Sequence, residues 1–197
     1  MTSYSSTRNK RNHFRIIAGE WRSRKLAFPG DVESLRPTTD RIRETLFNWL
    51  QQKIPGARCL DLFAGSGALA FEACSRHAAH VTAIDSSARV TDMIRENCRL
   101  VQCSTMEVIT ADSMQWLEKQ SGEHLYDIVF LDPPYSKNLL SQCFALLESG
   151  NYLAPEGIVY LESDSSLERL SLPSNWQLLR SKKAGQVYFG VCAKTMN

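Results

Sequence analysis

From Cys59 onward, short apolar runs with the character of strands alternate with amphipathic stretches of helical spacing. The expected strands cover residues 59–63, 81–85, 106–109, 126–131 and 157–161, and the expected helices cover residues 67–77, 87–101, 112–120 and 137–149. Two further strands, near 176–182 and 186–193, flank a turn at Ala184-Gly185. This pattern predicts an α/β fold with a seven-stranded, mostly parallel sheet, one antiparallel strand and helices on both faces.

Four of these strands carry an acidic residue at or near the carboxyl end, namely Asp61, Asp85, Asp112 and Asp132. Open α/β sheets bind ligands in a crevice outside the carboxyl ends of their strands. Four acids in such positions therefore predict one shared site. Each acid taken alone is explained better as a turn residue or as the N-cap of a helix than as a ligand-binding residue.

The motif Asp132-Pro133-Pro134-Tyr135 directly follows the apolar run 126–131. Proline fixes φ and disfavours helical geometry in the residue before it, so the motif predicts a stiff turn. At the end of a strand, such a turn presents a carboxylate, a proline carbonyl and an aromatic ring together. Two acceptors and a stacking ring suit a planar base that carries an amino group, although Asp-Pro is also an ordinary start for a surface loop.

A glycine-rich turn joins the first of these strands to a helical stretch. Gly65 and Gly67 allow positive φ and a close approach of a ligand to the backbone. The pattern Gly65-x-Gly67-x-x-Ala70 also satisfies the loose dinucleotide fingerprint, with Asp85 about 20 residues further on for a ribose, so a nicotinamide enzyme stays an alternative. A carboxylate at Asp61 would repel a pyrophosphate, whereas it suits an adenosyl cofactor with a sulfonium and an amino group.

Charge is unevenly distributed along the chain. Residues 1–43 hold ten basic and four acidic side chains, a net charge of +6, and the remainder holds 13 basic and 17 acidic side chains, a net charge of −4. A basic segment suits a phosphate backbone, although charge runs also form ordinary solvated faces. Phe14 and Trp21 lie among its arginines, and aromatic rings and guanidinium groups both stack on unpaired RNA bases. We interpret the segment as an RNA-binding extension.

The chain divides into three parts. Residues 1–12 are polar and are expected to form a disordered basic tail. Residues 13–53 are expected to form a basic hairpin, with strands at 15–17 and 24–28, followed by a helix at 41–52 that is capped near Thr39. Residues 54–197 are expected to form a single catalytic domain.

The six cysteines contain no Cys-x-x-Cys pair, and several fall on apolar positions of predicted strands or helices. This distribution favours buried thiols in a reducing cytoplasm over disulfides or metal ligands. No apolar run approaches the roughly 18 residues that a membrane span needs, and the polar start lacks the apolar core of a signal peptide. We therefore expect a cytoplasmic protein without a metal or a membrane partner.

The order Asp-x-Phe-x-Gly-x-Gly, a strand-end acid and then Asp-Pro-Pro-Tyr resembles the Rossmann-like class I S-adenosylmethionine-dependent methyltransferases that modify exocyclic amines of bases. This resemblance covers residues 57–193. Residues 14–26 and 35–50 are in addition similar to the RsmD family, which extends the resemblance to nearly the whole chain. Members of that bacterial family methylate the 2-amino group of one guanine in 16S ribosomal RNA.

The resemblance implies that activity here, with S-adenosylmethionine as cofactor, 16S ribosomal RNA in the small subunit as partner, and a monomeric enzyme. The implied catalytic residues are Asp132, Pro133, Pro134 and Tyr135. The implied cofactor-binding residues are Asp61, Phe63, Gly65, Gly67, Asp85, Asp112, Ser113 and Asp132. The expected RNA-binding residues are Arg15, Trp21, Arg22, Arg24, Lys25, Arg36 and Arg43. The segment around Thr39, Asp40 and Arg43 lies where the family brings its N-terminal element over the cofactor.

Three alternatives remain open at this stage. The same tetrapeptide geometry serves methylation of adenine in DNA or RNA, or of a protein glutamine, although the glutamine enzymes usually carry Asn at the position of Asp132. A nicotinamide oxidoreductase would differ in which cofactor stabilises the protein. A non-catalytic ribosome assembly factor would have no structural need for the Asp132–Tyr135 motif.

Overall fold

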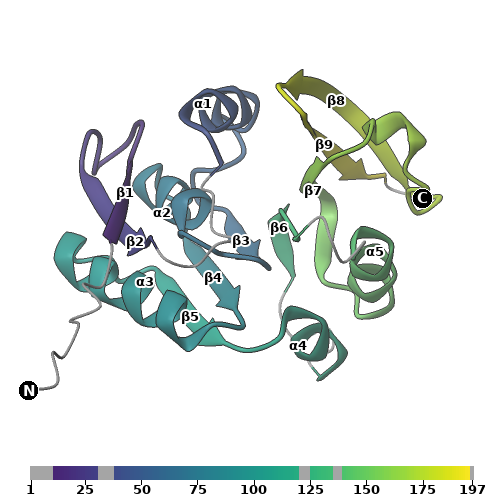
Figure 1. Ribbon diagram of the computed structural model, residues 1–197. Helices are drawn as coiled ribbons and strands as arrows, with labels where there is room; N and C mark the ends of the chain where they lie inside the picture. The colour runs from purple at the N-terminus through teal and green to yellow at the C-terminus, as the bar shows by residue number, and fades with distance from the viewer. Residues whose placement is uncertain (1–10, 31–37, 120–124, 135–138, 196–197) are drawn as a thin grey trace, which may run out of the picture.

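The computed structural model describes residues 11–30, 38–119, 125–134 and 139–195 (Figure 1). A seven-stranded sheet has the order β5-β4-β3-β6-β7-β9-β8. Its strands are β3 (Arg58–Asp61), β4 (His80–Asp85), β5 (Met106–Thr110), β6 (Tyr126–Leu131), β7 (Leu153–Ser163), β8 (Trp176–Ala184) and β9 (Val187–Lys194). Strands β3 to β7 pair in parallel, and β9 runs antiparallel between β7 and β8. The predicted Rossmann-like fold, with one antiparallel strand, is confirmed.

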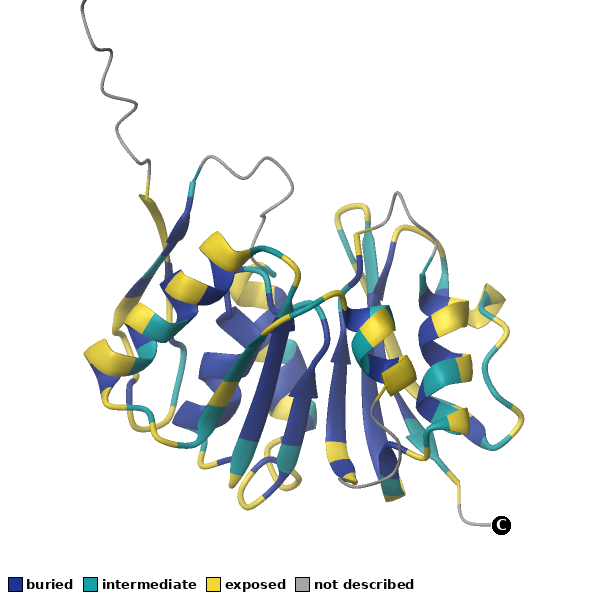
Figure 2. Cartoon of the chain, turned by 90° about the horizontal axis from the view of Figure 1, so that it is seen from below, coloured by how far each residue is buried: buried dark blue, intermediate teal, exposed yellow. Residues whose placement is uncertain are grey.

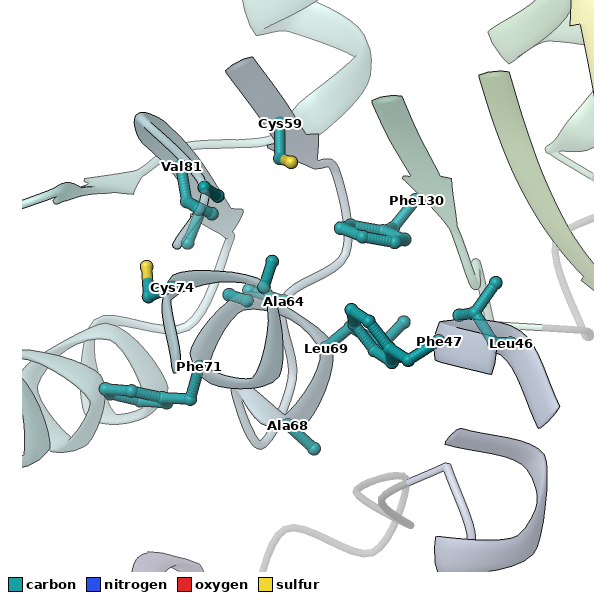
Figure 3. Close-up of a cluster of buried hydrophobic side chains, with 14 of the residues drawn as sticks. Leu46, Phe47, Cys59, Ala64, Ala68, Leu69, Phe71, Cys74, Val81 and Phe130 are labelled. Atoms are coloured by element: carbon teal, nitrogen blue, oxygen red, sulfur yellow. The ribbon is translucent and has the colours of Figure 1, made fainter. Parts of the chain in front are cut away.

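Helices cover both faces of this sheet (Figure 1). They are α1 (Asp40–Trp49), α2 (Ala68–Ser75), α3 (Ala88–Val101), α4 (Ser113–Lys119) and α5 (Leu140–Ser149), with a short 3₁₀ helix, η2 (Leu167–Arg169). Successive residues of a strand point to opposite faces, and β6 accordingly sends Phe130 to the α1–α3 core and Leu131 to the α4–α5 core. Phe130 lies beside Phe47 of α1, with ring centroids 6.0 Å apart (Figure 3).

Burial follows these layers. The central strands are buried, and helices such as α3 expose only their outer face (Figure 2). No helix in the described part of the chain is long and apolar enough to cross a membrane. All six cysteines are free thiols.

The N-terminal hairpin of β1 (Arg11–Arg15) and β2 (Lys25–Pro29) packs on the outer face of α2. The backbone amides of Ile17 and Ala18 donate to the Glu72 carboxylate at 2.8 and 3.0 Å, and the Ser75 hydroxyl donates to the Ala18 carbonyl at 2.6 Å. All eight residues of α2 are buried as a result. The hairpin is therefore part of the core and not a separate arm.

Several predicted boundaries differ from the observed ones. Arg11 and Asn12 belong to β1, not to a disordered tail, and residues 1–10 lie outside the described residues. Strand β7 is longer than the predicted 157–161 because the chain around Glu156, which takes a positive φ of 59°, bulges out while Leu153 still pairs with β6. Helix α1 begins as predicted, since the Thr39 hydroxyl accepts from the amide of Ile42.

Candidate active site

The glycine-rich turn after β3 is held open toward a ligand. Gly65 and Gly67 take φ values of 51° and 79°, which favour glycine. A Cβ on Gly67 would lie 3.1 Å from the ring of Phe71. The amide of Gly65 donates to Asp85 Oδ2 at 3.0 Å, which fixes the turn against the end of β4.

Asp61 ends β3 and is only 2% exposed. Its Oδ2 atom is buried and has no hydrogen-bond partner within the described residues. Burial, together with the charge of Asp85, raises the pKa of Asp61 to about 7, although backbone amides of Phe63 and Ala70 favour the ionised form. A buried, unpartnered carboxylate oxygen beside a glycine turn suits a cationic ligand.

Asp85 and Asp112 contact backbone amides as well as facing the crevice. Asp85 is half-buried, and its second oxygen accepts from the Ser87 amide at 2.8 Å. Burial raises its pKa, whereas the bonds from Ser87 and Gly65 lower it. Asp112 is exposed and caps α4, because its Oδ1 accepts from the amides of residues 114 and 115 at 3.0 Å each. The N-cap alternative is confirmed for Asp112, which also follows the carboxyl end of β5, and its role toward a ligand stays a prediction.

Ser113 does not present a free hydroxyl proton to the crevice. Its side chain is buried, and the hydroxyl donates to the Leu62 carbonyl, which ties the start of α4 to the end of β3. Phe63, the neighbour of Leu62, is half-buried and packs against the α4–α5 core.

Asp132 follows β6 and lies half-buried at the same edge of the sheet as Asp61 and Asp85. Burial raises its pKa well above the usual range, and the charges of Glu162 and Asp61 raise it further, while a hydrogen bond from Thr38 lowers it. Pro133 is buried and Pro134 exposed. Tyr135 lies outside the described residues.

Glu162 is a site residue that the sequence analysis missed. It lies on β7 next to the Asp132 turn, since Leu131 pairs with Leu161, and it is 3% exposed. Its Oε1 accepts from the Thr38 hydroxyl at 2.9 Å and from the Tyr160 hydroxyl at 2.7 Å. The available signal was its position directly after the predicted strand 157–161, the same position that singled out the other acids.

Thr38 joins the N-terminal segment to this site. Its hydroxyl contacts both Glu162 and Asp132, so the segment before α1 reaches the crevice. Thr39 caps α1 and Asp40 pairs with Arg43, and their position relative to the cofactor stays a prediction.

A pocket of about 60 Å³ lies beside the Asp132 turn, lined among others by Pro133, Pro134, Leu139, Glu162, Ser163 and Ser165. It extends the crevice from the β6 end toward the β7 end. A larger hollow of about 270 Å³, bordered by Lys53 and Asp127, lies at the amino ends of the strands and contains none of the predicted site residues.

The predicted RNA-binding residues separate into two groups. Arg15, Arg22, Arg24 and Lys25 are exposed on the hairpin, and Arg36 lies outside the described residues. Trp21 and Arg43 are buried, so the structure offers neither side chain to an external ligand in the way that it offers the exposed arginines. Trp21 packs in the α1–α3 core with Phe14, and Arg43, which is 0% exposed, donates to the Arg15 carbonyl at 2.8 Å and to Asp40 at 2.6 Å.

The family model described as "Conserved hypothetical protein 95" matches residues 14–193. The chain is also 45% identical to Ribosomal RNA small subunit methyltransferase D of Escherichia coli K12 over 89% of its own length and 87% of that protein. The chain belongs to this family, the RsmD family. The protein of the same name from Haemophilus influenzae is 43% identical, with 93% of this chain and 95% of that protein covered.

Solved structures of RsmD-family relatives have the same fold. The structure described as a putative methyltransferase yhhF from Escherichia coli superposes with a TM-score of 0.85 at 43% identity, covering 94% of this chain and all of that one. The putative methylase HI0767 of Haemophilus influenzae gives a TM-score of 0.80 at 40% identity, with the same coverage. The class I methyltransferase fold is thereby established. Among the described residues, no group of three or more His, Cys, Asp or Glu side chains could hold a metal ion.

Proposed function

We propose that the protein transfers a methyl group from S-adenosylmethionine to the exocyclic 2-amino group of a specific guanine in 16S ribosomal RNA. The names of the relatives from Escherichia coli and Haemophilus influenzae support methylation of small-subunit RNA. The single observation that carries the choice of an amine is the Asp132-Pro133 turn, which lies at the same sheet edge as Asp61 and the glycine turn.

Asp61, Phe63, Gly65 and Gly67 would line the methionine and ribose side of the cofactor. The unpartnered Oδ2 of Asp61 fits the cationic part of the cofactor. The positive φ of both glycines lets the cofactor approach the backbone. Asp85 would accept from the ribose hydroxyls. Asp112 would accept from the adenine amino group with Oδ2, because Oδ1 caps α4.

The bound cofactor supplies an electrophilic methyl carbon attached to a sulfonium. An exocyclic amine is a poor nucleophile because its lone pair is delocalised into the ring. Asp132 and the Pro133 carbonyl accept hydrogen bonds from the two amine protons, which turns the lone pair toward the methyl carbon. Asp132 or water would take up the proton that the amine loses once it carries the methyl group. Tyr135 would stack on the base.

The RNA would be recognised partly through the assembled small subunit. A chain of 197 residues offers little surface for reading a sequence, so a preassembled particle would supply part of the recognition. We expect faster methylation of subunits than of deproteinised RNA. Equal rates on the two substrates would refute this part of the proposal.

The test is transfer of tritiated methyl groups to small subunits from unmodified cells and to their extracted RNA, with nucleoside analysis of the product. A peak of 2-methylguanosine is the expected result. Methyladenosine would favour the adenine alternative. Absence of transfer to either substrate, despite measured cofactor binding, would favour a non-catalytic assembly factor.

A further inference from the structure

The C-terminal hairpin carries a concentration of positive charge that is separate from the N-terminal segment. Residues 169–197 contain five basic and no acidic side chains, a net charge of +5, whereas residues 44–168 contain eight basic and 17 acidic side chains, a net charge of −9. Within the hairpin, residues 180–183 are all exposed on β8, and they include Arg180, Lys182 and Lys183. The C-terminal residues 169–197 are therefore basic, whereas residues 44–168 are acidic.

These cations are arranged over aromatic rings. The Arg180 guanidinium and the Lys182 ammonium lie 6.0 and 5.8 Å from the ring centre of Trp49, which stacks on Phe189 at 5.6 Å. The Lys183 ammonium lies 4.6 Å from the ring centre of Tyr188. Among the described residues, no carboxylate forms an ion pair with any of the three cations. Their charge is available to an external anion.

The sheet register places this surface beside the active site. Lys182 pairs with Phe189, and Phe189 pairs with Glu162, so the three residues form one row across β8, β9 and β7. Adjacent strands are about 4.8 Å apart, which puts the backbone of Lys182 roughly 10 Å from that of Glu162. The β8–β9 hairpin lies next to α1 (Figure 1). The segment before α1 also reaches the site, through the bond from Thr38 to Glu162.

We propose that Arg180, Lys182 and Lys183, on the edge strand β8, form a second RNA-binding surface, which holds phosphates of the single-stranded nucleotides next to the target guanine. Arg180 and Lys182 lie on the α1 face of the sheet and Lys183 on the opposite face, so the RNA would contact this edge from both faces. This inference rests on the proposed function for its choice of RNA. Exposed cations held over aromatic rings, without carboxylate partners, have the charge and chemistry that single-stranded RNA requires.

The test compares the triple variant Arg180→Gln, Lys182→Gln, Lys183→Gln with a matched triple variant Lys53→Gln, Arg99→Gln, Lys119→Gln. The control removes the same charge from three exposed residues, which lie after α1 or in the last turns of α3 and α4. Helices of such a fold run antiparallel to its strands, so these positions lie at the edge of the sheet opposite the site. Binding of fluorescently labelled, deproteinised small-subunit RNA is measured as a function of salt.

Three phosphate contacts to a single strand release about two counterions, so losing them lowers affinity about 100-fold at 0.1 M salt and reduces the salt slope by about 2. We expect this loss in the first triple variant, with unchanged affinity for S-adenosylhomocysteine and an unchanged kcat at saturating RNA. An effect no larger than that of the control would overturn the proposal. Weaker binding to subunits with unchanged binding to deproteinised RNA would assign the surface to a protein and would also overturn it.

This comparison is independent of the methylated product. If the wild-type protein yields no 2-methylguanosine, the proposed function fails, and the salt dependence of RNA binding still decides whether β8 contacts RNA.

Discussion

Substitution of Glu72 by Gln tests how the N-terminal hairpin is held on the catalytic body. The carboxylate is 0% exposed and accepts four interactions: the amides of Ile17 and Ala18, the Arg76 guanidinium at 2.8 Å, and an ion pair at 3.7 Å with the buried Arg43. A glutamine side chain at this position would lack the charge that Arg43 requires, and its amide NH₂ would face a backbone donor.

Removing one partner of a buried ion pair typically costs about 3–5 kcal/mol. Arg43 keeps its 2.6 Å pair with Asp40, but the buried bonds that Glu72 accepts from Ile17, Ala18 and Arg76 are weakened at the same time. We expect a loss of that size in the free energy of unfolding. With a urea m value of about 2 kcal/mol/M, the midpoint falls by about 2 M.

The matched control is Glu96→Gln, which breaks the exposed pair with Arg11, and here we expect a loss of about 0–1 kcal/mol. The double variant Glu72→Gln, Arg43→Met also removes the buried guanidinium that has lost its Glu72 partner, and it is expected to recover part of the stability. A loss below about 1 kcal/mol in Glu72→Gln alone would refute the reasoning, since it would show that the buried pair does not hold the hairpin.

Further expectations concern the titrating groups of the site. Glu162→Gln removes a charge that raises the pKa of Asp132, so the acid limb of the pH–rate profile is expected to move to lower pH; Thr38→Val removes a bond that lowers this pKa and is expected to move the limb to higher pH. An unchanged profile in both variants would show that Asp132 does not need to be ionised. Because the pKa of Asp61 is about 7, cofactor binding below pH 7 is expected to release a proton, measured by calorimetry in buffers of different ionisation enthalpy, and Asp61→Asn should abolish the release. The folded pKa of Asp61 is raised above 3.8, so the ligand-free protein should lose stability as the pH rises from about 4 to about 7. Asp61→Asn should lose less, because the raised pKa values of Asp85 and Asp132 remain but that of Asp61 is removed; parallel stability curves would contradict this.

The strands and their ends were predictable because the periodic signal is local. Apolar runs such as 126–131 lie at the centre of the sheet, where pattern and burial agree, and the acids after them meet because parallel strands share one carboxyl edge. The same rule applied to Glu162 would have found the fifth acid of this edge.

The N-terminal segment was harder to interpret because its partners are distant in sequence. Arg43 and Trp21 resemble surface residues among other cations, yet both are buried by contacts that include α2, which follows only after β3 and the glycine turn. Nothing local in the sequence indicates that Glu72 will accept the amides of Ile17 and Ala18. Likewise, the first strand covers Arg11–Arg15 and not the predicted residues 15–17. It pairs with β2 from Arg11 opposite Pro29 to Arg15 opposite Lys25.

The most direct test of the central claim is methyl transfer by Asp132→Ala, with Asp92→Ala as control. Asp92 is an exposed carboxylate on α3 that pairs with Arg95 of the same helix, so its loss should leave transfer unchanged. Removing the desolvated carboxylate of Asp132 should not unfold the protein, and we expect S-adenosylhomocysteine binding to persist. Transfer to small subunits should fall about 100-fold or more. Transfer at the wild-type rate would contradict the assignment of Asp132 as the group that orients the guanine amine.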